Sequence, residues 1–372
     1  MVTMNIMRTY YNLSFPFIPH AGSYTIDEKM GLIRFFSICS IVWGHCLLSW
    51  DARHVVQPQF EWYKVVFLQL GKIGTINFFI ITGYFLNNKI QNMSILGYLK
   101  YRFYPLILPW IIFLMIFVFI ESLKVLTIHQ FTTLSLLGIV HIIINLGGSF
   151  IFHSAYWFIP ISILSALTLI LFKRFVNQYW FGIILALITL FYCFNLYNGW
   201  IATNHTKSIF GYTFFMWLGY FIKLKYSTFK DLLKIVHWRL IVFLLIATYF
   251  LACEEGVLLA KIGSDDPFAS IRLSNILLTV LLFIAILKIR IPNKVEAFKP
   301  ERFCYGIYLL HCIIIAQFTS ILSKMECSRF FTNSFFNALI LRLSFFSVII
   351  FLSILSVGLI GRTRFKFIFG LK

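Results

Sequence analysis

Long runs of apolar residues recur along this chain and are separated mostly by short polar segments. A helix of about 20 apolar residues crosses the ~30 Å hydrocarbon core of a bilayer. The runs also lack the alternating pattern of outer-membrane β-strands. Ten runs have a suitable length: 32–50, 65–86, 104–124, 155–172, 179–197, 209–223, 237–253, 271–288, 303–323 and 337–360. The sequence therefore predicts an all-α fold, a polytopic transmembrane helical bundle of about ten spans. Residues 131–150 predict a re-entrant or interfacial helix, with an eleventh span as the alternative.

Composition excludes a water-soluble globule. Hydrophobic residues make up 60% of the 372 residues and charged residues only 12%, whereas soluble domains carry about 25% charged residues. The gaps between the runs leave no room for a soluble catalytic domain, since domains of this kind need roughly 100 residues or more. Any chemistry must therefore take place inside the bundle or at its mouths.

The positive charges follow a topological pattern. With ten spans and a cytoplasmic N-terminus, most of the 32 Lys and Arg residues fall on the cytoplasmic side, as the positive-inside rule requires. We therefore expect both termini in the cytoplasm, with a cytoplasmic segment over 1–31, a transmembrane domain over 32–362 and a cytoplasmic tail over 363–372. The net charge of +19 is then a topology signal that also favours contact with anionic membrane lipids, and no nucleic-acid binding is expected.

Two ionisable residues, Arg34 and His45, lie inside the first apolar run with ten residues between them. Eleven helical steps bring the two side chains to one face of a helix, about 16 Å apart along its axis. An arginine near the centre of a bilayer costs about 2.5 to 3.5 kcal/mol, so it usually faces a bundle interior or a ligand. The alternative is that Arg34 snorkels to the interface and His45 makes an interhelical hydrogen bond.

The ionisable groups within the runs are cationic or imidazole groups: Arg34, His45, Lys72, His311 and Arg342. All thirteen acidic residues lie outside the apolar cores of the runs, which argues against a carboxylate-based ion pathway and favours an anionic ligand. The seven cysteines form no CxxC pair, and no HExxH segment is present, so no metal site is predicted.

Five segments in order resemble the acyltransferase 3 family of bacterial integral-membrane acyltransferases, along nearly the whole chain. Arg34 and His45 match the family's arginine and histidine ten residues apart. The other matching segments are 77–85 (NFFIITGYF), 101–105 (YRFYP), 156–159 (YWFI) and 305–311 (YGIYLLH). The resemblance extends to the enzymes that O-acetylate O-antigen and enterobacterial common antigen.

The resemblance implies a multi-pass enzyme of the bacterial inner membrane that moves an acyl group, usually acetyl from acetyl-CoA, to a hydroxyl of a surface polysaccharide or its lipid-linked precursor. It implies no tightly bound cofactor. Arg34, Lys100 and Arg102 then bind the phosphates of the donor, because guanidinium groups suit phosphate. His45 is either a general base for the sugar hydroxyl, which we favour, or a nucleophile that forms an acyl-imidazole.

The expected substrate-binding residues are Asn77, Thr82, Trp157, Tyr308 and His311. Each of them has packing and hydrogen bonding as its alternative role. His129, His141 and His153 are expected mainly at the membrane interface. Two other functions remain open at this stage: a transporter or exporter of a glycan or small organic acid, and a non-catalytic scaffold for envelope assembly. The oligomeric state is left open.

Overall fold

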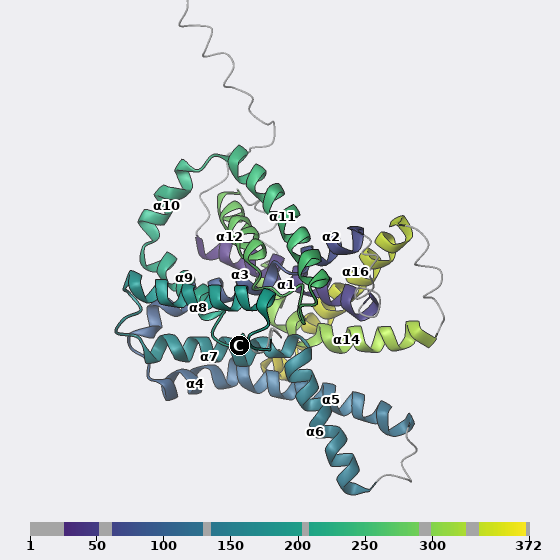
Figure 1. Cartoon of the computed structure of the whole chain (residues 1–372). Helices are drawn as coiled ribbons and strands as arrows, with labels where there is room; N and C mark the ends of the chain where they lie inside the picture. The colour runs from purple at the N-terminus through teal and green to yellow at the C-terminus, as the bar shows by residue number, and fades with distance from the viewer. Residues whose placement is uncertain are drawn as a thin grey trace, which may run out of the picture.

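The computed structural model describes residues 26–51, 62–128, 135–202, 208–289, 299–324 and 335–369. Every regular element within these residues is a helix and none is a strand, which confirms the all-α expectation (Figure 1). The elements are α1 (Ile26–Asp51), α2 (Trp62–Leu70), α3 (Gly74–Ile90), α4 (Ile95–Arg102), η1 (Phe103–Ile107), α5 (Leu108–Ile128), α6 (Leu136–His153), η3 (Ala155–Trp157), α7 (Phe158–Leu171), α8 (Tyr179–Asn198), α9 (Thr213–Leu224), α10 (Tyr226–Ile235), α11 (Trp238–Lys261), α12 (Leu273–Lys288), η4 (Pro300–Phe303), α14 (Cys304–Lys324), α16 (Phe335–Ile360) and η5 (Arg364–Phe369).

Six helical segments in the described part of the chain are long and apolar enough to cross a membrane. They are Trp62–Ile90, Ile95–Thr127, Tyr179–Asn198, Trp238–Lys261, Pro300–Ile321 and Leu339–Ile360. A seventh candidate is the pair Leu137–His153 and Ala155–Leu171, which meets at 73° as a broken span or a re-entrant loop. The apolar helices α9 and α12 are shorter than a full span. The structure thus supports a helical membrane protein but does not reproduce the expected count of ten.

Helix α1 lies between two hydrophobic cores. Its buried residues Met30 and Ile33 pack in a core built mainly from α3, α7, α9 and α12. Further along, Ile38, Val42 and Cys46 pack in a second core that includes α5, α14 and α16. The central position of α1 explains how a helix that carries Arg34 and His45 is kept away from lipid along much of its length.

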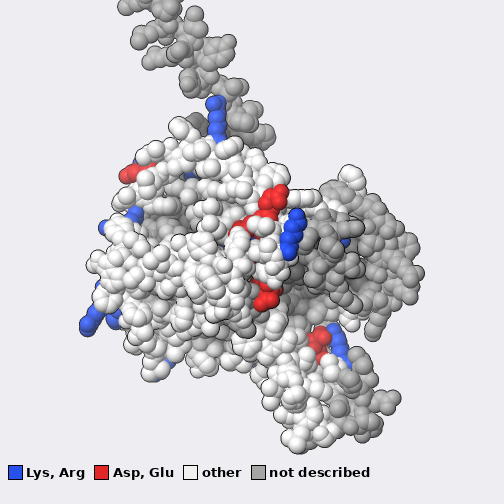
Figure 2. All heavy atoms as spheres, viewed as in Figure 1, with Lys and Arg blue, Asp and Glu red and all other residues white. Residues whose placement is uncertain are grey.

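The outward faces of the bundle are apolar. Large hydrophobic side chains are exposed on several helices, including Phe119 on α5, Ile183 on α8, Phe243 on α11 and Phe351 on α16. The view in Figure 2 shows few Lys, Arg, Asp and Glu residues, scattered on an otherwise uncharged surface. Such a surface suits a hydrocarbon solvent, in which exposed apolar groups cost nothing.

Glycines allow α3 and α9 to cross in backbone contact. A Cβ added at Gly83 would lie 1.7 Å from the carbonyl oxygen of Met216, and a Cβ added at Gly219 would lie 1.8 Å from that of Ile80. Small residues of this kind let membrane helices approach closely, and close packing is a main source of stability where water is absent.

We expect Gly219→Ala to destabilise the protein by more than the 1 to 3 kcal/mol that is typical of overpacking, because the obstructing atom is backbone. The yield of monodisperse protein and the melting temperature in detergent measure this loss. Gly358→Ala on α16 is the matched control, since nothing lies within 4 Å of its added Cβ. Equal melting temperatures for the two variants would contradict the prediction.

Candidate active site

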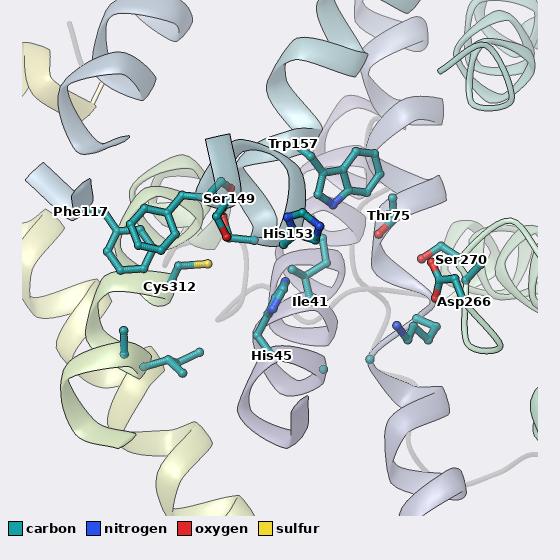
Figure 3. A pocket seen from close by; sticks show the side chains of 18 of the residues that line it. Ile41, His45, Thr75, Phe117, Ser149, His153, Trp157, Asp266, Ser270 and Cys312 are labelled. Atoms are coloured by element: carbon teal, nitrogen blue, oxygen red, sulfur yellow. The ribbon is translucent and has the colours of Figure 1, made fainter. Parts of the chain in front are cut away.

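A cavity of about 480 Å³ opens beside the C-terminal half of α1. Its walls come from α1, the break between α2 and α3, the start of α3, α5, α6, the segment before α7, the loop between α11 and α12, and α14. The polar residues that line it are His45, Lys72, Thr75, Ser149, His153, Ser154, Asp266, Ser270 and Thr319. In Figure 3, Phe117 and Cys312 lie on one side of His45, whereas Asp266 and Ser270 lie on the other.

His45 is placed by a close contact of α1 with the break between α2 and α3. A Cβ added at Gly71 would lie 2.4 Å from the Cα atom of Gly44, the residue before His45. On the other side of α1, the rings of His45 and His311 lie 5.3 Å apart. His311 is fully buried, and its Nδ1 donates to the carbonyl oxygen of Ile307 at 3.0 Å. The imidazole of His45 therefore rests against a fixed ring and faces the cavity.

Trp157 lines the same cavity, and hydrogen bonds fix the short helix η3 that carries it. The Tyr308 hydroxyl donates to the carbonyl oxygen of Ala155 at 3.0 Å. Trp110 Nε1 donates to the carbonyl oxygen of Tyr156 at 3.1 Å, and the Tyr156 hydroxyl donates to that of Leu309 at 2.7 Å. Bonds from α5 and α14 thus hold the segment at the point where α6 bends into α7.

A buried network joins the two polar segments on the other side of the cavity. The fully buried Arg272 donates through Nη2 to Gln69 Oε1 and through Nη1 to the carbonyl oxygen of Ala252, each at 2.5 Å. Gln69 Nε2 donates in turn to Asn275 Oδ1 at 2.7 Å. Asn275 Nδ2 donates to the carbonyl oxygens of Ser270 at 2.7 Å and Lys72 at 3.3 Å. The network ties the α2–α3 break to the α11–α12 loop.

Arg34 lies outside this cavity, nearer the N-terminal end of α1. Its guanidinium group lies 5.3 Å from the centre of the Phe85 ring. The charge of Arg102 repels it, and the carboxylate of Glu301 attracts it. Arg102 stacks near the rings of Tyr98 and Tyr101, and its Nε is buried without a hydrogen-bond partner. Two neighbouring guanidinium groups and a donor without an acceptor suit a polyanionic ligand.

Lys100 is exposed, and within the described residues no polar contact joins it to Arg34 or Arg102. Lys89 shares an aromatic neighbour with Arg102. Its ammonium group donates to the Tyr101 hydroxyl and lies 4.1 Å from the centre of the same ring on which Arg102 stacks. The basic cluster around Arg34 and Arg102 therefore includes Lys89.

Four predicted substrate-binding residues do not line the cavity. The Thr82 hydroxyl donates to the carbonyl oxygen of Phe78 at 2.7 Å, and buried Asn77 donates to that of Ile73 at 3.2 Å. Tyr308 and His311 lie behind the wall, where they hold η3 and flank His45. The structure thus brings together His45 and Trp157 at the cavity and places the other four outside it.

Sequence reasoning missed three residues of the cavity wall as site candidates. Lys72 was recognised only as an ionisable residue in an apolar run, His153 was expected at the interface, and no carboxylate was expected near His45. All three positions were hard to find because Lys72 and Asp266 lie in breaks between helices and His153 ends α6. One usable signal was the pair of aspartates in the short polar segment GSDDP between two apolar runs.

Comparison with protein families decides the class. A family model described as an acyltransferase domain, that of the acyltransferase 3 family, matches residues 27–362. The chain belongs to this family. It is therefore a membrane acyltransferase, and the match includes both the His45 cavity and the cluster around Arg34. Neither characterised proteins nor solved structures gave a significant match.

Proposed function

We propose that this acyltransferase moves an acetyl group from acetyl-CoA to a hydroxyl of a cell-envelope polysaccharide or its lipid-linked precursor, in the bacterial inner membrane. The single observation that carries the proposal is the arrangement along α1. One continuous helix of 26 residues carries Arg34 in a basic cluster and His45 in the wall of the cavity. The two residues are about 16 Å apart along the axis, a distance that an extended pantetheine arm can cover.

The basic cluster suits the donor. Coenzyme A carries several phosphate charges, and Arg34, Arg102 and Lys89 supply two planar guanidinium groups and an ammonium group around aromatic rings. A ligand phosphate would give the buried Nε of Arg102 the acceptor that it lacks in the described structure. We place the nucleotide of the donor at this basic cluster and its thioester beside His45.

The chemistry then needs one proton transfer in each direction. His45 accepts the proton of the sugar hydroxyl while the hydroxyl oxygen attacks the thioester carbonyl. The tetrahedral intermediate collapses with cleavage of the carbon–sulfur bond, and the imidazolium returns the proton to the leaving thiolate. The products are an O-acetyl ester and free coenzyme A, and His45 ends in its starting state.

The test of this function combines cells with purified protein. Envelope glycans from cells with the protein should carry O-acetyl groups, seen as a mass increment, that are missing from cells without it. Purified protein should transfer label from acetyl-CoA to the glycan of the deficient cells. Identical acetylation in both kinds of cells, together with no transfer in vitro, would refute the proposal.

We expect Arg34→Gln to raise the KM for acetyl-CoA about tenfold, because one charge-assisted phosphate contact is lost. The kcat at saturating donor should change little. Arg174→Gln is the matched control, since Arg174 is exposed and is not part of the proposed donor site. Steady-state kinetics with varied acetyl-CoA measure both values, and an unchanged KM in Arg34→Gln would remove Arg34 from the donor site.

The sidedness of the bundle is part of the proposal. We propose ten spans with both termini in the cytoplasm. The basic cluster around Arg34 then faces the cytoplasm, which supplies acetyl-CoA. The α11–α12 loop with Asp266 then faces the opposite side. Single cysteines introduced at exposed positions 265 and 174 should react with an impermeant maleimide from opposite sides of the membrane, once the native cysteines are replaced.

A further inference from the structure

We infer that the polar side of the cavity, with Asp266 and Lys72 as its determinants, is the binding subsite for an uncharged sugar of the acceptor. This inference rests on the proposed function. It concerns residues that the transfer chemistry itself does not use. In that chemistry His45 accepts and returns the proton, and Arg34 and Arg102 bind the phosphates of the donor.

The cavity is chemically divided. On one side of His45 its wall is mainly apolar, with Phe117, Phe150 and Ile315, and the two phenylalanine rings stack at 4.0 Å. Ser149 contributes a hydroxyl group on this side (Figure 3). On the other side stand Lys72, Asp266 and Ser270. Figure 3 shows Asp266 and Ser270 on the side of His45 that is opposite to Phe117. A polyhydroxylated ring suits the side with Lys72 and Asp266 better, because hydroxyl groups lose their hydrogen bonds against an apolar wall.

The fixed charges on the polar side balance. Lys72 is attracted by Asp266 and repelled by Arg272, and Arg272 is attracted by both Glu255 and Asp266. Of these four groups only Lys72 and Asp266 line the cavity, and their opposite charges leave no net charge there to attract an acidic sugar. An ammonium group and a carboxylate in the same cavity instead offer one donor and one acceptor, which together match neighbouring hydroxyl groups that each donate and accept.

The subsite is rigid enough to select a substrate. The bonds of Arg272, Gln69 and Asn275 fix the two backbone segments that present Lys72 and Asp266. The helix η3 is held on the neighbouring wall and presents Trp157, whose indole is a flat apolar surface for a sugar ring. Rigid aromatic surface with a few charged groups is the usual composition of a selective small-molecule site.

The experiment uses the full-length protein in detergent, labelled acetyl-CoA, and envelope polysaccharide prepared from cells that lack the protein. We expect Asp266→Asn to raise the KM for the polysaccharide at least about tenfold, since a hydrogen bond to a charged group is lost. The KM for acetyl-CoA should stay within about twofold. Asp265→Asn is the matched control, because Asp265 is the exposed neighbour with the same charge.

Lys72→Met tests the second determinant of the subsite, and it is the deciding variant if Asp266→Asn does not fold. It should raise the same KM, whereas Lys261→Met, at an exposed lysine, should not. Polysaccharide whose carboxyl groups have been chemically reduced should remain an equally good acceptor, because the subsite binds an uncharged ring.

Each opposite result has its own meaning. An unchanged polysaccharide KM in both Asp266→Asn and Lys72→Met overturns the subsite while leaving the proposed function intact. A lower kcat with both KM values unchanged also overturns it, since Asp266 would then act on His45. Loss of transfer to the reduced polysaccharide overturns its selectivity for an uncharged ring. Failure of the unmodified protein to acetylate any polysaccharide overturns the proposed function and the subsite together.

Discussion

His45→Ala is expected to lower the rate of acetyl transfer by about 100- to 10,000-fold, the usual contribution of a positioned general base. The ring lies in the cavity wall and adjoins the buried ring of His311. No other imidazole on α1 can replace it, because α1 contains a single histidine. The fold should survive, since the removed ring faces a cavity and a small side chain remains on the helix. Transfer of label from acetyl-CoA to polysaccharide measures the effect.

The matched control is His141→Ala. His141 is exposed on α6 and its ring contacts Asn145, so this variant should transfer acetyl at the normal rate. Rapid quenching of the unmodified protein with acetyl-CoA alone separates the two roles considered for His45. A general base leaves no acetyl group on the peptide that contains His45, whereas a nucleophile leaves an acyl-imidazole. Full activity of His45→Ala would refute both roles.

The sequence predicted the α1 part of the site because the regular geometry of one helix determines it. Residues spaced eleven apart share a face on any α-helix, and α1 runs unbroken from Ile26 to Asp51. The all-α membrane class followed equally directly from composition. The match of residues 27–362 to an acyltransferase family was also anticipated, since five short segments in fixed order are unlikely to arise together by chance.

The rest of the cavity depends on contacts between distant segments. The loop that carries Asp266 is tied to α2 by the bond from Arg272 to Gln69, 203 positions away in the chain. Apolar periodicity carries no information about such a bond. A search for carboxylates within the apolar runs therefore does not find Asp266, which enters the cavity wall from a loop. The span count of ten is not confirmed, because α9 and α12 are shorter than a bilayer and α6 meets η3 and α7 at a sharp bend.

Gly71→Ala is expected to reduce kcat about 100-fold, the effect of displacing a catalytic group by roughly 1 Å. Its added Cβ would lie 2.4 Å from Cα and 2.8 Å from the backbone nitrogen of Gly44. Backbone atoms cannot rotate away as a side chain does, so α1 must shift at the residue that precedes His45. The backbone of Gly71 does not have a positive φ, so alanine is not strained there for conformational reasons. The contact alone causes the loss.

Gly44, on the other side of this contact, allows the size of the effect to be ranked. A Cβ added at Gly44 would lie 3.2 Å from Gly71, which is tight but far less severe, so Gly44→Ala should lose clearly less activity than Gly71→Ala. Gly148→Ala in α6 meets nothing within 4 Å and should keep full activity. The kcat of the three variants, with their melting temperatures in detergent, tests the order. If Gly44→Ala lost as much activity as Gly71→Ala, the position of His45 would not depend on this contact.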